Sequence, residues 1–177
     1  ADANATTALT TALYQYDGLG RRTLKNVDGK ITKYILDGEN VLLELTETDT
    51  IKTRYTHSLA IDDIISMDTD ADQNGSLETT YYYHKDGLGS VSKLTDSTGA
   101  VVQAYVYDAF GQITEQQNMS LAQPYTYTGR EFDAESDLYY LRARYYSSSL
   151  GRFITGDPSL TISGNSRIPF LLFQQLT

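Results

Sequence analysis

A short tyrosine, aspartate and glycine motif recurs along the chain, and this repeat limits the fold more than any other feature. It reads Tyr16-Asp17-Gly18-Leu19-Gly20 near the start and Tyr83-His84-Lys85-Asp86-Gly87-Leu88-Gly89 in the middle, with variants at residues 34–38 and 107–111. The copies recur about every 20 residues once one insertion is allowed for, which is the spacing of a small supersecondary unit. The sequence therefore predicts a fold built from repeated units.

Each unit is predicted to be a β-hairpin. Turn dipeptides such as Asp28-Gly29 and Asn74-Gly75 supply positive φ angles, and the segments between them are rich in Val, Ile, Thr and Tyr. In Tyr105-Val106-Tyr107 and Tyr125-Thr126-Tyr127 the alternation places the tyrosines on one face of a strand. Residues 138–146 also fit a strand better than a helix. One hairpin cannot bury its apolar face, so consecutive hairpins are expected to pair into an all-β, curved or spiral, barrel-like sheet.

The composition excludes several classes of protein. The 177 residues contain no cysteine, so disulfides and thiolate metal sites are excluded. Asp plus Glu outnumber Lys plus Arg by 23 to 14, and the formal net charge of −9 disfavours nucleic acid and anionic membranes as partners. Apolar stretches such as residues 168–173 are too short for a membrane span, which takes about 20 residues.

The sequence divides into four predicted parts. Residues 1–13 form an N-terminal extension without the basic flank or apolar stretch of an export signal. Residues 14–123 carry the repeats, interrupted by an acidic insertion at 66–78. Residues 124–158 form a distinct block, called the core block below, and residues 159–177 form a C-terminal tail that loses the repeat pattern.

The repeats and the core block resemble the Rhs repeat-associated core of the Rhs/YD-repeat family. Four stretches carry the resemblance: Asp108-Ala109-Phe110-Gly111, Gly129-Arg130-Glu131-Phe132-Asp133, the run from 138 to 146, and Gly151-Arg152-Phe153 followed by Asp157-Pro158. The family includes Rhs polymorphic toxins, the C component of Tc toxins and teneurins, and the resemblance implies a hollow shell of spiralling β-hairpins whose end the core block closes. The motif residues in this sequence are Tyr16, Asp17, Gly20, Tyr107, Asp108, Gly111, Gly129, Arg130, Tyr139, Tyr140, Arg142, Arg144, Tyr145, Tyr146, Gly151, Arg152, Phe153, Asp157 and Pro158.

The resemblance also raises the question of self-cleavage, because in this family a variable effector follows the core and is often released downstream of the Asp-Pro motif. An aspartyl protease needs two carboxylates that share a proton, and the family suggests Asp157 with Asp133 or Asp137. Here Ser159-Leu160 follows the Asp-Pro motif where a glycine is usual, and no second Asp-Pro site lies downstream. We therefore assign no catalytic residue, expect Asp133 to cap a turn, and predict that the chain is not an enzyme.

The acidic insertion is a candidate calcium site. Asp70, Asp72, Asn74 and Gly75 match the first half of an EF-hand-type loop, and Glu78 stands at its ninth position. Position 12 is a tyrosine instead of the bidentate glutamate. A weak calcium site and a solvated acidic hairpin loop are both open interpretations, and no other cofactor is expected.

Two further sets of polar residues are given structural roles. The arginines of the core block are expected to face its acidic residues in an ion network inside the wall. The arginines are Arg130, Arg142, Arg144 and Arg152, and the acids are Glu131, Asp133 and Asp157. His57 and His84 follow tyrosines in predicted strands and are expected to be ordinary sheet residues.

These observations predict a structural segment that forms the wall or end cap of a β-shell and that encapsulates or displays a partner. Its partner would be the rest of the shell. Two alternatives stay open: a self-assembling extracellular filament or tube, whose sheet edges bind copies of the same chain, and a truncated autoproteolytic core of a polymorphic toxin. The predicted location is secreted, extracellular or on the cell surface.

Overall fold

The computed structural model describes residues 10–60, 62–72, 74–156 and 173–175, and these are almost entirely β-strand and turn. The one helix among them is a single 3-10 turn, η1 (Tyr127–Gly129), so none of the described helical structure is long and apolar enough to cross a membrane. The strands are β1 (Thr10–Tyr16), β2 (Arg22–Val27), β3 (Lys30–Asp37), β4 (Asn40–Leu45), β5 (Ile51–His57), β6 (Ile64–Thr69), β7 (Thr79–Lys85), β8 (Val91–Thr95), β9 (Val101–Tyr107), β10 (Ile113–Gln116), β11 (Glu131–Asp133), β12 (Leu138–Leu141), β13 (Arg144–Ser147), β14 (Arg152–Phe153) and β15 (Phe173–Gln175).

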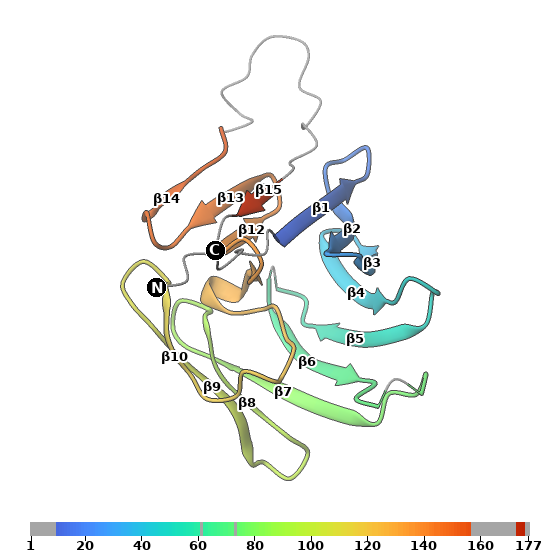
Figure 1. The fold of residues 1–177 in the computed structure, drawn as a ribbon. Coiled ribbons are helices and arrows are strands. Elements are labelled where there is room, and N and C mark those ends of the chain that lie inside the picture. The colour runs from blue at the N-terminus through green and yellow to red at the C-terminus, as the bar shows by residue number, and fades with distance from the viewer. Residues whose placement is uncertain (1–9, 61, 73, 157–172, 176–177) are drawn as a thin grey trace, which may run out of the picture.

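The first ten strands form one long meander, called the wall below. Each strand pairs antiparallel with its neighbour in sequence from β1 to β10, and β15 adds an eleventh strand beside β1. The sheet curves, so that β1 and β10 lie on two sides of the core block (Figure 1). The prediction of an all-β, hairpin-built curved sheet is confirmed, although the wall does not close on itself.

The Asp and Gly of the repeat are explained by the turns that join the strands. In the turn after β1, Asp17 Oδ1 accepts the backbone N–H groups of Leu19 and Arg21 at 2.9 and 3.0 Å. The turn closes on Gly20, whose φ of 82° is a left-handed conformation that favours glycine. The same arrangement recurs at the turns that begin with Asp86, Asp96 and Asp108.

The tyrosines of the repeat point to the inner face of the wall. Tyr34, Tyr55, Tyr83 and Tyr105 are buried there together with apolar residues, and Tyr125 of the core block packs edge-on against the rings of Tyr55 and Tyr83. Because tyrosine is large and flat, a row of them fills the space between the wall and the core block.

The core block forms a second sheet of four strands, in the order β11-β12-β13-β14. One face packs on the start of the wall, where the hydroxyls of Tyr16 and Tyr145 lie 2.8 Å apart. The other face contacts the end of the wall, where Tyr139 donates a hydrogen bond to the carbonyl oxygen of Gly111 at 2.7 Å. The small sheet therefore bridges the first and last hairpins of the wall (Figure 1).

Several local predictions differ from the structure. Residues 138–146 form two strands, β12 and β13, because Arg142 adopts a φ of 59° and turns the chain. Tyr125 makes an isolated bridge with Glu131, and Tyr127 begins η1, so these two tyrosines do not share a strand. Residues 66–69 of the predicted acidic insertion belong to β6, which leaves residues 70–78 as its loop.

Candidate functional site

The seam between the wall and the core block contains a buried arginine. Arg22 of β2 is only 3% exposed, and its guanidinium meets Asp133 at 2.6 Å and Glu131 at 2.5 Å. Three tyrosine rings surround the guanidinium at 4.4 to 5.4 Å, and these rings belong to Tyr14, Tyr34 and Tyr140. A planar, delocalised cation suits such a site because it can pair with carboxylates at its edge and stack on rings at its faces.

A lysine of the same strand extends this ion network. Lys25 Nζ lies 3.0 Å from Asp133 Oδ1 and 2.9 Å from Glu135 Oε1. The hydroxyl of Tyr14 donates to the same glutamate at 3.0 Å. The wall thus supplies two cations to three acidic residues of the core block.

This environment shifts the pKa values of the two acidic residues of β11 in opposite directions. Burial raises the pKa of Glu131, and its contact with Arg22 only partly opposes this. Burial also acts to raise the pKa of Asp133, but Arg22 and Lys25 together hold it below its usual value. Asp133 is therefore a stable carboxylate, whereas Glu131 takes up a proton more readily than an ordinary glutamate.

In a second ionic contact at the seam, the wall supplies the acidic residue and the core block supplies the arginines. Asp62, in the turn between β5 and β6, accepts from Arg130 and Arg142 of the core block, each at 2.6 Å. Arg142 also reaches Glu39 of the wall at 3.3 Å. Since each side offers both charges, the two contacts together fix how the core block is placed on the wall.

Tyrosine hydroxyls and glycines complete the seam. Tyr146 donates to the carbonyl oxygen of Phe110 at 2.9 Å, next to the Tyr139 contact with Gly111. Gly111 has a φ of 86°, and a methyl group on it would overlap the ring of Tyr127. A methyl group on Gly129 would lie 2.9 Å from the backbone oxygen of Asp62, and one on Gly151 would lie 3.1 Å from the ring of Phe110. The core block therefore rests directly on the turns that the repeat motif forms.

Of the three suggested protease residues, the described structure places Asp133 and Asp137. Asp133 is fully buried in contact with Arg22 and Lys25, and its backbone carbonyl accepts from Ser136, which closes a turn. Asp137 is exposed in the turn before β12, with a φ of 57°. Asp157 and Pro158 lie outside the described residues.

Two arginines of the predicted ion network, Arg130 and Arg142, pair with the wall instead of with the acids of the core block. Arg130 and Arg142 bind Asp62 of the wall, and the guanidinium of Arg144 lies 3.7 Å over the ring of Phe153. Glu131 and Asp133 pair with Arg22 of the wall, and Asp133 also with Lys25, none of which was predicted. Arg22 is the first residue of β2 and follows shortly after the first copy of the repeat motif. His57 and His84 lie in β5 and β7 as expected.

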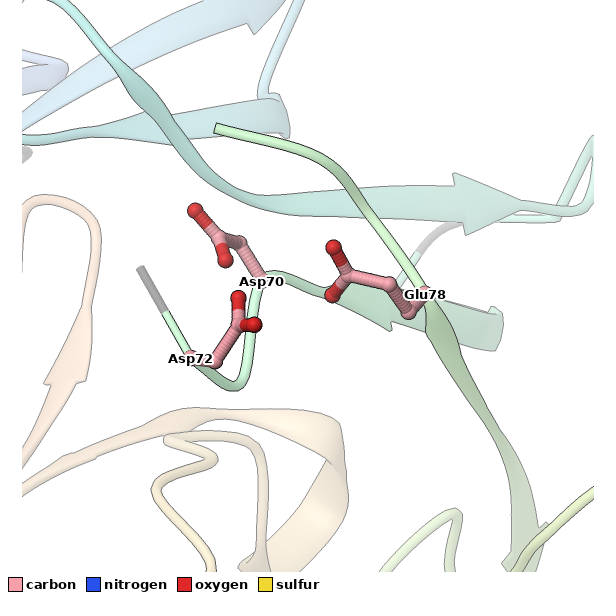
Figure 2. A group of neighbouring side chains, drawn as sticks. All are labelled: Asp70, Asp72 and Glu78. Atoms are coloured by element: carbon pink, nitrogen blue, oxygen red, sulfur yellow. The ribbon is translucent and has the colours of Figure 1, made fainter. Parts of the chain in front are cut away.

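The candidate calcium residues lie together in the loop between β6 and β7. Carboxylate oxygens of Asp70, Asp72 and Glu78 come within 4.8 Å of one another (Figure 2). Asp70 also accepts the backbone N–H groups of Asn74 and Gly75, at 3.0 and 2.8 Å. The side chain of Asn74 donates to Asp72, so its oxygen faces Ser76. These hydrogen bonds suit an acidic hairpin loop, and calcium binding remains a prediction.

The fold and seam define a curved hairpin wall that is bridged by its own C-terminal sheet. The family model described as the teneurin YD-shell matches residues 4–169. The chain therefore belongs to the teneurin YD-shell family.

Two relatives show how widely this segment occurs. The tRNA(Glu)-specific nuclease WapA of Bacillus subtilis subsp. natto (strain BEST195) is 36% identical over 159 residues, which cover 88% of this chain and 6% of the relative. Salivary gland surface protein 1 of Aedes aegypti is 32% identical over 164 residues, which cover 84% of this chain and 5% of the relative. The chain thus spans only a small part of the relatives it matches.

The fold also matches a solved structure. The crystal structure of TcdB2-TccC3-Cdc42 superimposes with a TM-score of 0.68 over 92% of this chain and 8% of that chain, at 22% identity. This likeness places the chain in the YD-shell fold.

The prediction that the chain is not an enzyme is contradicted by these comparisons. The Bacillus relative carries an enzymatic activity in its name, that of a tRNA nuclease. The prediction rested on the missing cleavage pattern, because no second Asp-Pro site follows Asp157-Pro158 in this sequence. That argument concerns this chain alone. The segment that matches this chain is only 6% of the Bacillus relative, so the argument does not apply to the rest of that protein.

Proposed function

We propose that this chain is a wall segment with its closing core block, within the shell of a longer, secreted or surface-exposed, toxin-type protein that carries an enzyme. The observation that supports this most strongly is the seam, where the four-stranded sheet bridges β1 and β2 to the turn before β10. A sheet that ends a hollow wall must make such contacts on both of its faces.

The relatives support a housing role for the segment. A bacterial tRNA nuclease and an insect surface protein share it over more than four fifths of this chain. A segment common to proteins with such different names is better suited to holding or displaying another part than to selecting a substrate. The word "surface" in the insect relative's name supports an exposed location.

A chimera tests this proposal. This chain would replace the matched segment of the Bacillus nuclease, and the chimera would be compared with the parent by limited proteolysis and electron microscopy. We expect a shell of the same size and protease resistance. A chimera that folds locally but leaves the shell open would contradict the proposal.

Light scattering on the isolated chain separates the shell segment from the filament alternative. A wall segment is expected to be a compact monomer near 19.7 kDa. Rods or tubes would instead favour a self-assembling subunit, because unpaired sheet edges template further strands.

A further inference from the structure

The outer edge of β10 is an open strand edge. β10 ends the strand order of the wall, and among the described residues it pairs only with β9. The chain runs on from β10 into the core block, where β11 pairs with β12 instead. No strand of the described residues therefore covers this edge.

A groove of ≈ 280 Å³ separates this edge from the core block. Phe132 and Asp137 of the core block line the groove opposite Ile113 and Glu115 of β10, and Met119, which is 81% exposed, also lines it. The described residues that line the groove include two carboxylates and no basic side chain. The groove thus combines apolar side chains with two carboxylates.

The backbone of β10 offers a hydrogen-bond donor to this groove. Gln117 donates its N–H to the carbonyl oxygen of Ala104 on the β9 side, at 3.0 Å. Successive backbone groups of a strand point to opposite sides, so the N–H of Gln116 faces away from β9. At the other end of the wall, the three residues of β15 already pair with β1, which is an example of a short strand adding to this sheet.

We propose that the β10 edge binds an extended peptide segment from the part of the longer polypeptide outside this chain. The peptide adds a strand to β10 and places a basic side chain between Glu115 and Asp137. Main-chain pairing supplies the affinity and side-chain pockets supply the selectivity in this mode of recognition. The source of the peptide rests on the proposed function, in which this chain is part of a longer polypeptide, as the matched segment is only 6% of the Bacillus relative.

Peptide binding to the 177-residue chain tests the chemistry of the groove. Two fluorescent peptides of alternating valine and threonine would be titrated, one with two lysines and one with two glutamates. The lysine peptide is expected to bind, whereas the glutamate peptide and an N-methylated lysine peptide, which lacks backbone donors, are not. Equal binding of the lysine and glutamate peptides would overturn the proposal.

Two variants make this test specific. Glu115→Lys combined with Asp137→Asn is expected to reverse the preference towards the glutamate peptide, and asparagine tolerates the positive φ at position 137. Gln116→Pro removes the outward N–H and is expected to abolish binding of both peptides. Unchanged binding by either variant, with cooperative thermal unfolding retained, would contradict strand addition at β10.

Hydrogen exchange tests the source of the peptide. The amide of Gln116 is expected to exchange quickly in the isolated chain and slowly in the Bacillus chimera, where the rest of the polypeptide is present. Fast exchange in both would overturn the assignment, as would concentration-dependent protection in the isolated chain, which would assign the edge to a second copy. Shell size and protease resistance of the chimera report separately on the proposed function.

Discussion

Arg22 and Asp133 lie 111 positions apart in the sequence, and their charged groups meet at 2.6 Å in the interior of the protein. Arg22 belongs to the second strand of the wall and Asp133 to the first strand of the core block. Their contact joins the start of the wall to the core block. A buried pair of this kind contributes little net stability when intact, but removal of one partner leaves an uncompensated charge.

Arg22→Met is therefore expected to lower the free energy of unfolding by about 3–5 kcal/mol, because Asp133 loses its closest cation in a buried site. Chemical denaturation followed by circular dichroism measures this change. Arg54→Met is the matched control, since Arg54 pairs with Asp68 at 2.8 Å with 57% of its side chain exposed. The control is expected to cost at most about 1 kcal/mol. Equal losses in the two variants would mean that the buried network does not hold the core block.

Asp133 also predicts a dependence of stability on pH. Its pKa in the folded chain is held below the unfolded value of 3.8, so its ionised form stabilises the fold above that value. This contribution is lost as the pH falls below 3.8 and through the lower folded pKa. Asp133→Asn is expected to be less stable than the wild type at neutral pH. This difference in free energy of unfolding is expected to shrink as the pH falls below 3.8.

The control for this pH experiment is Asp137→Asn, in the same turn region but exposed. Its stability is expected to follow that of the wild type at every pH. Unfolding curves collected from pH 7 to pH 2.5 make the comparison. A difference for Asp133→Asn that stays constant across this range would show that the carboxylate does not titrate as the ion pairs require.

Calcium binding to the loop after β6 is a separate prediction. At the weak end of calcium sites, with a dissociation constant of about 1 mM, 10 mM calcium would stabilise the fold by about 1.4 kcal/mol. Thermal unfolding with and without calcium measures this, with magnesium as the comparison ion. Asp72→Asn combined with Glu78→Gln is expected to remove the effect while Asp70 still accepts its two backbone N–H groups. If calcium does not raise the unfolding temperature of the wild type, the loop is an acidic hairpin loop without a calcium site.

The hairpins could be predicted from sequence because their interactions are local. Asp17 and Asp108 each accept the backbone N–H groups two and four residues ahead, so a short sequence motif is enough to predict the turn. The seam could not be predicted in this way. Charge alone does not say which acid an arginine meets, and Arg142 binds Asp62, 80 positions away, in place of the nearby acids of its own block. Only the curvature of the wall brings these residues together.

Gly111 gives the sharpest test of how the core block rests on the wall. Gly111 and Gly99 occupy equivalent turns with φ values of 86° and 85°, so an alanine at either position bears the same backbone strain. The surroundings differ, because a methyl group at Gly99 meets nothing within 4 Å and one at Gly111 overlaps the ring of Tyr127. Gly111→Ala is therefore expected to cost about 1–3 kcal/mol more than Gly99→Ala in free energy of unfolding. In the double variant with Tyr127→Ala, the excess should largely disappear, because the overlapping ring is gone. Equal losses in the two single variants would mean that Tyr127 does not pack on this turn, and that the core block is not seated on the end of the wall.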